Sequence, residues 1–279
     1  MLKDNSKITS LNIGINSIGT EGATAVAEAL KINTTVTVLD LSNGLRDDGP
    51  SIGVEGARAV ADALIVNTRV TRLNLGGNRV GFQGARALSE MLKINRTITR
   101  IEVYGNSFGD SGAQASADAL TVNTTLTSIN LEYNSLSDVG ARALASVLKT
   151  STSVTSVNLE YNSIEGEGAK AIADALKENT TVTDINLEHN SIGDVGVRAL
   201  AKALKVNTTV TSLNLTRSSV TDVGARKLAK ALRVNTFLKS LNLTENPIGI
   251  EGERALTDAL KVNTTVKVVG VDPSHWCFI

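Results

Sequence analysis

Apolar and polar residues follow two different rhythms that take turns along this chain. Short stretches such as "SLNL" (240–243) alternate polar with apolar residues, which is the pattern of a strand buried on one face. Longer stretches such as "GARALASVL" (140–148) place Ala and Leu at helical spacing, with Asp138 before them and Lys149 after them. Those charges suit the two ends of a helix dipole. Each such unit therefore predicts one strand followed by one helix.

The unit recurs along the whole chain. The apolar residue just before each strand motif falls at Ile8, Val36, Val70, Ile98, Leu126, Val154, Val182, Val210, Leu238 and Val266, in steps of 28 residues except for a second step of 34. One such unit cannot bury its apolar face alone, whereas stacked units share a continuous core. Because aromatic residues make up only 3% of the chain, we expect that core to consist of Leu, Val, Ile and Ala.

The stretch "VTSVNLEYN" (154–162) matches the pattern L-x-x-L-x-L-x-x-N and so resembles the leucine-rich repeat signature. The 28-residue length and the "GARALA" helix look like the ribonuclease-inhibitor-like subfamily, which is similar to the repeat regions of cytosolic nucleotide-binding immune receptors. The resemblance implies an α/β fold. It would be a right-handed solenoid, or horseshoe, with a concave parallel β-sheet and convex α-helices.

We expect one repeat domain over residues 1–279, with nine to ten repeats and a C-terminal strand and tail cap at 266–279. The long second step reflects a six-residue insertion near 44–50, within "SNGLRDDGPS" (42–51). Gly, Asp and Pro favour a turn there. The insertion either overhangs the concave rim and touches a ligand, or is a tolerated surface loop. Both interpretations stay open on the sequence.

Recurring asparagines predict structural roles. The asparagine that ends each signature is expected to satisfy backbone groups where the chain leaves the strand. It stands at Asn16, Asn78, Asn106, Asn134, Asn162, Asn190 and Asn246, and is replaced by Gly44, Ser218 and Ser274 in the other units. The glycine of each "GAR" is expected to open the helix. The triplets such as Asn207-Thr208-Thr209 recur with the repeat and give no indication of glycosylation.

The two residues before each structural asparagine vary most, and the repeat architecture gives no reason for "EY" or "EH" there. Stacked glutamates at these positions would repel one another by about 1 kcal/mol per pair in water. Tyr and Arg are common anchors of protein interfaces. The candidate partner-binding residues of the concave face are Arg72, Arg100, Glu102, Tyr104, Glu132, Tyr133, Glu160, Tyr161, Asp184, Glu188, His189 and Arg217.

On the helices, a basic residue recurs at positions 58, 86, 142, 170, 198, 226 and 254. This stripe is interpreted as a solvated surface paired with nearby acids, with an anionic partner as the alternative. The balance of 28 basic and 28 acidic residues gives no reason to expect nucleic acid or an anionic membrane as partner. No apolar run is long enough to span a membrane, and no secretory signal follows Met1.

The single cysteine, Cys277, excludes an intramolecular disulfide, and a reducing cytoplasm is the expected location. No phosphate-binding, zinc or dinucleotide motif is present, so no cofactor and no metal is expected. The alternatives are weak: a metal at Glu160, Glu188 and His189, or His275 and Cys277 as base and nucleophile without an orienting group. We therefore expect no enzyme activity.

The sequence favours a non-enzymatic interaction scaffold that binds a protein or peptide through the concave face. The alternative is a ligand-sensing or regulatory segment of a larger immune-receptor-like or effector protein, because the chain starts inside a repeat. The oligomeric state is not determined by the sequence.

Overall fold

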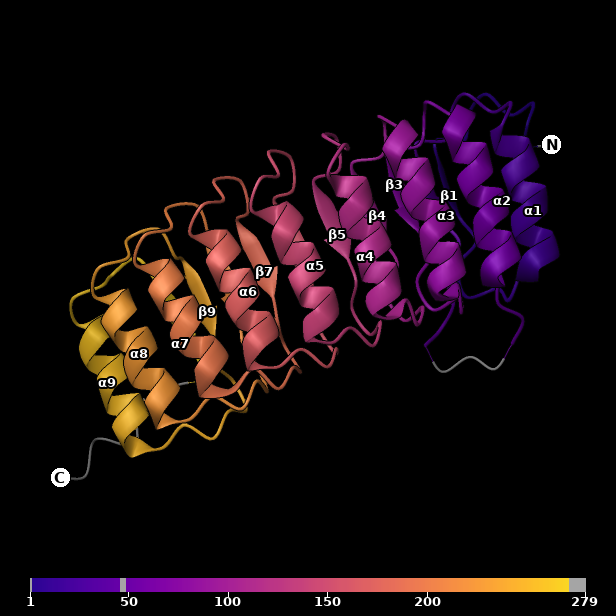
Figure 1. Cartoon of the computed structure of the whole chain (residues 1–279). Helices are drawn as coiled ribbons and strands as arrows, with labels where there is room; N and C mark the ends of the chain where they lie inside the picture. Colours follow the sequence, from indigo (N-terminus) through magenta and orange to yellow (C-terminus); the bar gives the residue numbers. More distant parts are fainter. Residues whose placement is uncertain (1, 46–48, 271–279) are drawn as a thin grey trace. The chain divides into compact units, whose positions relative to one another are not determined.

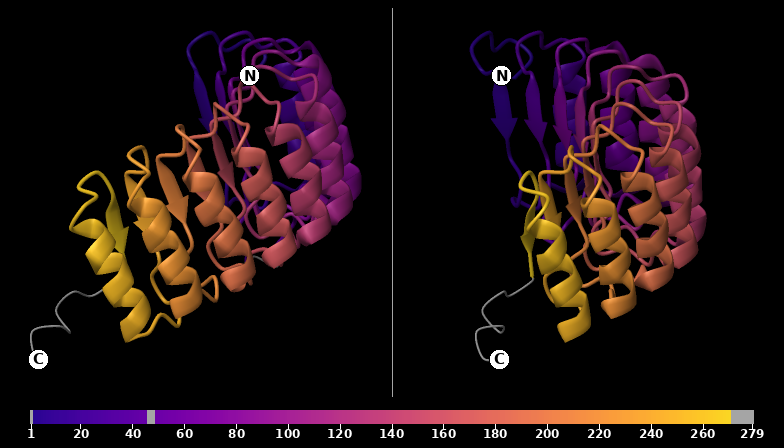
Figure 2. Two further views of the ribbon diagram at one scale, coloured as in Figure 1. Left: turned by 60° about the vertical axis from the view of Figure 1, so that its left-hand side comes forward. Right: turned by 90° about the vertical axis from the view of Figure 1, so that its left-hand side faces the viewer.

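Ten strands alternate with nine helices in residues 2–45 and 49–270, the part of the chain that this computed structural model describes. The chain divides into two compact units, Met1–Ser135 and Leu136–Ile279. In each unit the helices form one layer and the strands another (Figures 1 and 2). That the whole chain is a single domain, as the repeat pattern suggests, stays a prediction.

The first unit contains five short strands, each of which pairs in parallel with the next in chain order. These strands are β1 (Ser10–Asn12), β2 (Val38–Asp40), β3 (Arg72–Asn74), β4 (Arg100–Glu102) and β5 (Ser128–Asn130). Four helices cover one side of them: α1 (Gly19–Leu30), α2 (Gly53–Val66), α3 (Gly81–Ile94) and α4 (Gly109–Leu120).

The second unit repeats the arrangement, again with parallel neighbours in chain order. Its strands are β6 (Ser156–Asn158), β7 (Asp184–Asn186), β8 (Ser212–Asn214), β9 (Ser240–Asn242) and β10 (Lys267–Val269). Its helices are α5 (Asp138–Leu148), α6 (Gly166–Leu176), α7 (Gly193–Leu204), α8 (Asp222–Leu232) and α9 (Ile250–Leu260). The alternating strand and helix and the parallel sheet confirm the predicted α/β repeat fold.

The core lies between the two layers. In most strands the central residue is buried and its two neighbours are at least partly exposed, as the alternation predicts. The helices contribute Ala and Leu, which are buried at helical spacing, as in α8 with Ala225, Leu228 and Leu232. Apart from Met91 and Phe108, the buried apolar side chains of the described residues are Leu, Val, Ile and Ala.

The expectation that the glycine of each "GAR" opens the helix is wrong. Helix α2 begins at Gly53, three residues before Gly56, and α3 begins at Gly81, before Gly84. A Cβ on Gly56 would lie 2.8 Å from the Cβ of Ile52 and 3.1 Å from the Cβ of Ala23 on the preceding helix. The glycine is therefore needed because neighbouring elements approach closely, not because the helix starts there.

The predicted structural asparagines form a ladder in which Asn78, Asn106, Asn134 and Asn190 are buried, Asn162 and Asn246 are half-buried and Asn16 is exposed. The Nδ2 of Asn106 donates to the carbonyl oxygens of Leu75, Val103 and Tyr104, at 2.9, 3.0 and 3.1 Å. Its Oδ1 accepts backbone N–H bonds in the preceding repeat, so each asparagine links two repeats. Ser218 takes the same place with only its hydroxyl, 3.2 Å from the carbonyl oxygens of Leu187 and Thr216.

A second asparagine ladder was not predicted as structural. The asparagine of each "NTT" triplet, and of its variants "NTR", "NRT" and "NTF", is at most 7% exposed. In Asn207, for example, the Oδ1 accepts the N–H groups two and three residues later. Its Nδ2 donates back to the preceding repeat; for Asn207 the acceptor is the Leu176 carbonyl oxygen at 2.8 Å. These residues are Asn33, Asn67, Asn95, Asn123, Asn179, Asn207, Asn235 and Asn263. Their burial agrees with the interpretation that the triplets are not glycosylation sites.

Candidate functional site

We call the side of each sheet that faces away from the helices the strand face. The predicted partner-binding residues are divided between the two units. The first unit carries Arg72, Arg100, Glu102, Tyr104, Glu132 and Tyr133, and the second carries Glu160, Tyr161, Asp184, Glu188, His189 and Arg217. Each set is therefore described by itself.

In the first unit, the two arginines occupy neighbouring strands. Arg72 on β3 and Arg100 on β4 are register partners, and both side chains are exposed. The Nε of Arg100 donates to the Oε1 of Glu102 at 2.5 Å, so Glu102 offsets part of this local positive charge. The pair is largely exposed on the arginine side, and its contribution to stability is about 1 kcal/mol or less.

The ring of Tyr104 lies against Gly76. A Cβ on Gly76 would lie 2.2 Å from the ring of Tyr104, so the ring occupies the space that a larger residue would need. Next to it, a Cβ on Gly77 would lie 2.2 Å from the carbonyl oxygen of Asn43. The absence of side chains at 76 and 77 thus allows the neighbouring chain segments to close over this part of the sheet.

The insertion reaches the same surface. Leu45 is 51% exposed, and its Cδ2 would lie only 2.1 Å from a Cβ added to Gly105. Residues 46–48 of the insertion lie outside the described residues, and a role for the loop in ligand contact stays a prediction. Beyond Gly105, Tyr133 is 53% exposed and is therefore the more accessible tyrosine of this unit.

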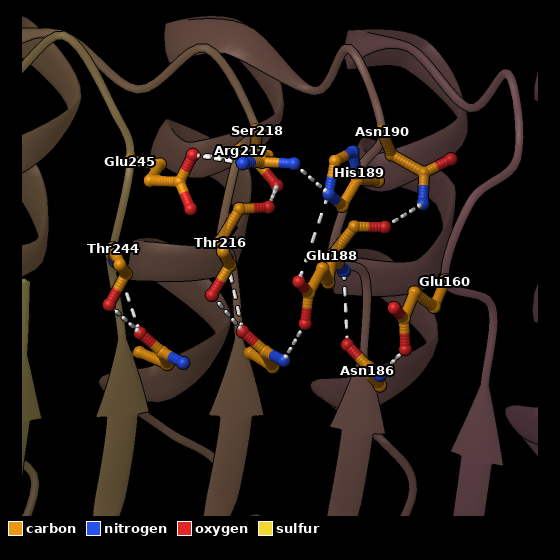
Figure 3. Close-up of polar contacts among 12 residues, drawn as sticks. Glu160, Asn186, Glu188, His189, Asn190, Thr216, Arg217, Ser218, Thr244 and Glu245 are labelled. Carbon is orange, nitrogen blue, oxygen red and sulfur yellow. Dashed lines mark hydrogen bonds and ion pairs between the residues drawn. The ribbon is translucent and has the colours of Figure 1, made fainter.

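In the second unit, four large side chains form a continuous column across neighbouring repeats. The rings of Tyr161 and His189 stack with centroids 3.8 Å apart and an interplanar angle of 15°. An N–H of Arg217 donates to the Nε2 of His189 at 2.9 Å, and the guanidinium forms an ion pair with Glu245 (Figure 3). We call Tyr161, His189, Arg217 and Glu245 the ring–ion column.

The column occupies an unusual backbone conformation. All four residues have φ between 50° and 55°, in the left-handed region. This region suits glycine, and a bulky residue there carries a cost of about 1 kcal/mol or more. The corresponding positions of the first unit include Gly77 and Gly105, with φ values of 69° and 62°, and also Ile15 and Tyr133, with φ values of 56° and 55°.

The charges of the column centre on Arg217. Its Nη1 lies 2.9 Å from the Nε2 of His189, and that Nε2 is also 4.0 Å from the Oε1 of Glu188. The hydrogen bond to Glu245 raises the pKa of Arg217 above its ordinary value. The column therefore holds one stacked ring pair and one neutralised ion pair.

The glutamates do have structural partners, so the expectation that architecture gives them no role is wrong for two of them. Glu160 accepts a hydrogen bond from the Nδ2 of Asn186 at 2.9 Å, and Glu188 accepts one from the Nδ2 of Asn214 at 2.8 Å. The Oδ1 of Asn186 accepts the backbone N–H of Glu188 (Figure 3). An amide thus stands between the two carboxylates, which reduces the repulsion expected from stacked glutamates.

A shallow cavity of about 220 Å³ lies beside this chain of hydrogen bonds. It is lined by the strand residues Ser156, Val157, Asn158, Asp184, Ile185, Asn186, Ser212 and Asn214. Asp184 is exposed there, and one of its carboxylate oxygens accepts the hydroxyl of Thr183 at 2.6 Å. Small polar side chains and the carboxylate of Asp184 therefore line a hollow on the strand face of the second unit. Two of its lining residues, Asn186 and Asn214, donate to the carboxylates of Glu160 and Glu188.

The other chemistry considered from the sequence finds no support in the described ranges. There, no three His, Cys, Asp or Glu side chains are grouped so that they would hold a metal ion. His275 and Cys277 lie outside the described residues. Among the helices that the structure describes, none has both the length and the apolar character that a membrane span requires.

Sequence reasoning missed Glu245, Thr216, Asn186 and Asn214 as members of this network. Glu245 and Thr216 stand at the variable positions, so their columns were recognised, but their contacts were not. The available signal was the bulky residue directly before each structural asparagine. Glycine at 77 and 105 indicates that this position has a positive φ, and Tyr, His, Arg and Glu depart from that preference.

Comparisons with known proteins agree with this geometry. A family model described as "Leucine Rich repeat" matches seven segments: 4–27, 66–89, 122–145, 150–173, 178–201, 206–229 and 234–256. The solved structure of the leucine-rich repeat-containing protein LegL7 from Legionella pneumophila is 20% identical, covers 95% of this chain and 83% of its own, and has a TM-score of 0.56. At this identity the likeness shows the fold alone.

The actin-binding site 2 of leiomodin-1 is 19% identical and covers 77% of this chain and 91% of its own. Its TM-score of 0.38 is too low to support any inference. A comparison with curated protein sequences finds no match.

Proposed function

Because the chain belongs to the leucine-rich repeat family, whose members usually bind proteins and are usually not enzymes, we propose that it is a protein-binding scaffold whose second unit presents the principal site. The partner, a protein or peptide, lies across the strand face, over the ring–ion column and the adjoining hollow. Tyr133, Tyr104 and the arginines of the first unit form a separate candidate surface.

The observation that carries this proposal is the conformation of the ring–ion column. Four bulky residues in consecutive repeats adopt the left-handed region where glycine would be less strained. Local backbone strain is concentrated at functional sites. Exposed tyrosine and arginine are also the residue types that dominate protein interfaces, because they bury much area at low entropic cost.

The charge around the hollow indicates the chemistry of the partner. Glu245 neutralises Arg217, so the carboxylates of Glu160, Asp184 and Glu188 leave this surface acidic. A partner segment with Lys or Arg side chains complements it, and electrostatic complementarity supplies specificity and a faster association rate. Tyr161 offers a flat ring on which an arginine guanidinium can stack.

The experiment is affinity capture from a native lysate followed by measured dissociation constants for the recovered protein. Two strand-face variants are compared, Tyr161→Ser with Asp184→Asn in the second unit and Tyr104→Ser with Tyr133→Ser in the first. The matched control is Arg142→Ser with Lys149→Ser on α5, two exposed residues of the helix layer. We expect the second-unit variant to weaken binding about tenfold or more, because interface anchors commonly account for such losses.

The expected control result is a change of less than about twofold, since exposed charges outside an interface contribute little. A partner that binds the second-unit variant as tightly as the natural sequence would contradict the proposed site. Equal loss in the α5 control would place binding on the helix layer instead. A partner whose affinity rises with salt would contradict the proposed charge complementarity.

A further inference from the structure

The helix layer carries a regular ion-pair position that the proposed strand-face site does not use. The recurring basic residue of the helices, such as Arg58, defines one position of the repeat. Four residues after that position, six of the nine helices in the described ranges have an acidic residue: Glu28, Asp62, Glu90, Asp118, Asp174 and Asp258. In four of them this acid pairs with a lysine three residues later: Glu28–Lys31 at 2.6 Å, Glu90–Lys93 at 2.9 Å, Asp174–Lys177 at 2.6 Å and Asp258–Lys261 at 2.8 Å. An acid in this column is thus the usual state of the repeat.

Helices α7 and α8 reverse the charge of that column. Lys202 and Lys230 stand where the other repeats have an acid, so Lys205 and Arg233 have no acidic partner at the usual place. The first turn of α7 and α8 differs as well. In α2 and α6, Glu55 and Glu167 pair with the basic residue three positions later. At the equivalent position, α7 and α8 have the exposed Val195 and Val223.

The result is a two-by-three array of cations on adjacent helices. We call it the basic grid: Arg198, Lys202 and Lys205 on α7, and Arg226, Lys230 and Arg233 on α8, with Lys227 beside them. All seven side chains are exposed, and within the described part of the chain none of them forms an ion pair. With a rise of about 1.5 Å per residue and helix axes about 10 Å apart, the grid measures about 10 Å in each direction.

The acids of these two helices are engaged elsewhere. The Oδ1 of Asp194 accepts the backbone N–H groups of Thr221 and Gly224, at 3.0 and 2.9 Å. Asp222 does the same for the next repeat, with Gly249 and Gly252 as donors. Both carboxylates therefore cap the start of the following helix and do not neutralise the grid.

No ion pair in the described residues of this unit compensates for the grid. Like charges three or four residues apart on a helix destabilise it by about 0.2–0.5 kcal/mol per pair, whereas the acid of the other repeats would be favourable. The position of the cations near the C-terminal ends of α7 and α8 offsets only part of this cost through the helix dipole. A bound anion would remove it.

The neighbouring helices limit the width of the grid. A cavity of about 240 Å³ between α6 and α7 is lined by Arg198 and Lys202 on one side and by the pairs Glu167–Lys170 and Asp174–Lys177 on the other. On the far side, the hydrogen bond from Lys261, with smaller contributions from Arg254 and Arg233, lowers the pKa of Asp258, so a carboxylate also borders α8. The grid is therefore bordered by carboxylates of α6 on one side and of α9 on the other, while α7 and α8 lie side by side in the helix layer (Figure 1).

From this pattern we propose that α7 and α8 form a docking surface for an acidic helical segment of a partner protein. Such a segment, about 10 Å wide, lies along α7 and α8 and places carboxylates at i, i+4 and i+7 against the two rows of cations. A nucleic acid or a lipid bilayer extends past the grid and meets the carboxylates of α6 and α9. The surface is separate from the strand-face site, so either can fail without the other.

The test uses the full chain and a synthetic helical peptide of about 20 residues with glutamates on one face, long enough to form a helix. The same peptide with glutamine in place of glutamate is the control ligand. The key variant is Lys202→Glu with Lys230→Glu, which restores the acid of the other repeats and its i,i+3 pairing with Lys205 and Arg233. This variant should fold at least as well as the natural chain.

The matched control is Arg58→Glu with Arg86→Glu, which changes the net charge equally at the stripe position of α2 and α3. We expect the acidic peptide to lose about tenfold or more in affinity for the Lys202/Lys230 variant and less than about twofold for the Arg58/Arg86 control. The affinity for the natural chain should fall as salt rises.

Three results would overturn the proposal. The first is an equal loss of affinity in both variants, which would indicate attraction by net charge alone. The second is equally tight binding of the glutamine peptide. The third is tighter binding of polyuridine RNA or phosphatidylserine vesicles than of the acidic peptide, with the same dependence on Lys202 and Lys230, which would assign the grid to another class of ligand.

Discussion

The two units differ at one backbone position of the strand face: the first unit has glycine there in two repeats, beside Ile15 and Tyr133 in two others, whereas the second has Tyr161, His189, Arg217 and Glu245. In the first unit, Gly77 and Gly105 adopt the left-handed conformation, and neighbouring groups fill the space above them. In the second unit, Tyr161, His189 and Arg217 adopt the same conformation, and their own side chains contact one another. In the first unit, side-chain or backbone groups of other residues thus cover the two glycines. In the second unit, the side chains at this position form the surface themselves.

This difference separates residues that packing requires from residues that are candidates for binding. The glycines are needed because a Cβ would collide with adjacent residues, so their chemistry follows from packing. The column of the second unit has no such need, because glycine at 161, 189 or 217 would satisfy the backbone more easily. The residues that packing does not require are the better candidates for binding.

The largest expected effect concerns the asparagine ladder. In the first unit, Asn106→Ala removes five hydrogen bonds and leaves buried backbone groups without partners, so the free energy of unfolding should fall by about 3–4 kcal/mol. In the second unit, Ser218→Ala removes a single hydroxyl and should cost about 1 kcal/mol. Urea denaturation of both variants measures the difference. Equal losses of unfolding free energy in the two variants would contradict the idea that Ser218 stabilises the ladder less than an asparagine does.

The next effect concerns the closed surface of the first unit. Gly77→Ala should cost about 3 kcal/mol, because its Cβ would lie 2.2 Å from the Asn43 carbonyl oxygen at a φ of 69°. Gly109→Ala is the matched control, with a φ of 60° and no heavy atom within 4 Å of the added Cβ. It should cost only about 1 kcal/mol, the backbone cost alone. If thermal unfolding gives the same loss for both, close packing at Gly77 is not the reason for the glycine.

The smallest effect on stability should come from the ring–ion column. His189→Gly removes backbone strain of about 1 kcal/mol and a stacking contact of similar size, so the free energy of unfolding should change by less than about 1 kcal/mol. His189→Ala loses the stacking and keeps the strain, and should be less stable than the glycine variant. A glycine variant that is the less stable of the two would show that position 189 carries no strain.

Much of the fold was predictable because it depends on patterns that repeat. The period of about 28 residues, the alternation in the strands and the helical spacing of Ala and Leu indicated the elements and the parallel order before any coordinates were known. The ladder that includes Asn106 was also predictable, since an amide after a strand has backbone groups within reach. The ladder that includes Asn207 was visible in the sequence but was attributed to repetition alone.

The candidate site was predictable only as a set of columns. The sequence identified Glu160, Tyr161, Glu188 and His189 as variable residues beside one another, and whether they bind a partner stays a prediction. It did not show that an asparagine separates the two glutamates, or that Glu245 neutralises Arg217. Those facts depend on side-chain directions across repeats, which the residue order does not specify.

By itself, the sequence determined the alternation of strand and helix, the composition of the core and the positions at which the repeats differ, because these follow from periodicity and burial along one chain. The tertiary structure decided which of the residues that differ from the repeat pattern contact one another. Stacking repeats brings residues 28 positions apart into contact, so Tyr161, His189, Arg217 and Glu245 become neighbours. It also sets the unpaired cations of α7 beside those of α8, and these contacts across repeats are where the proposed binding chemistry lies.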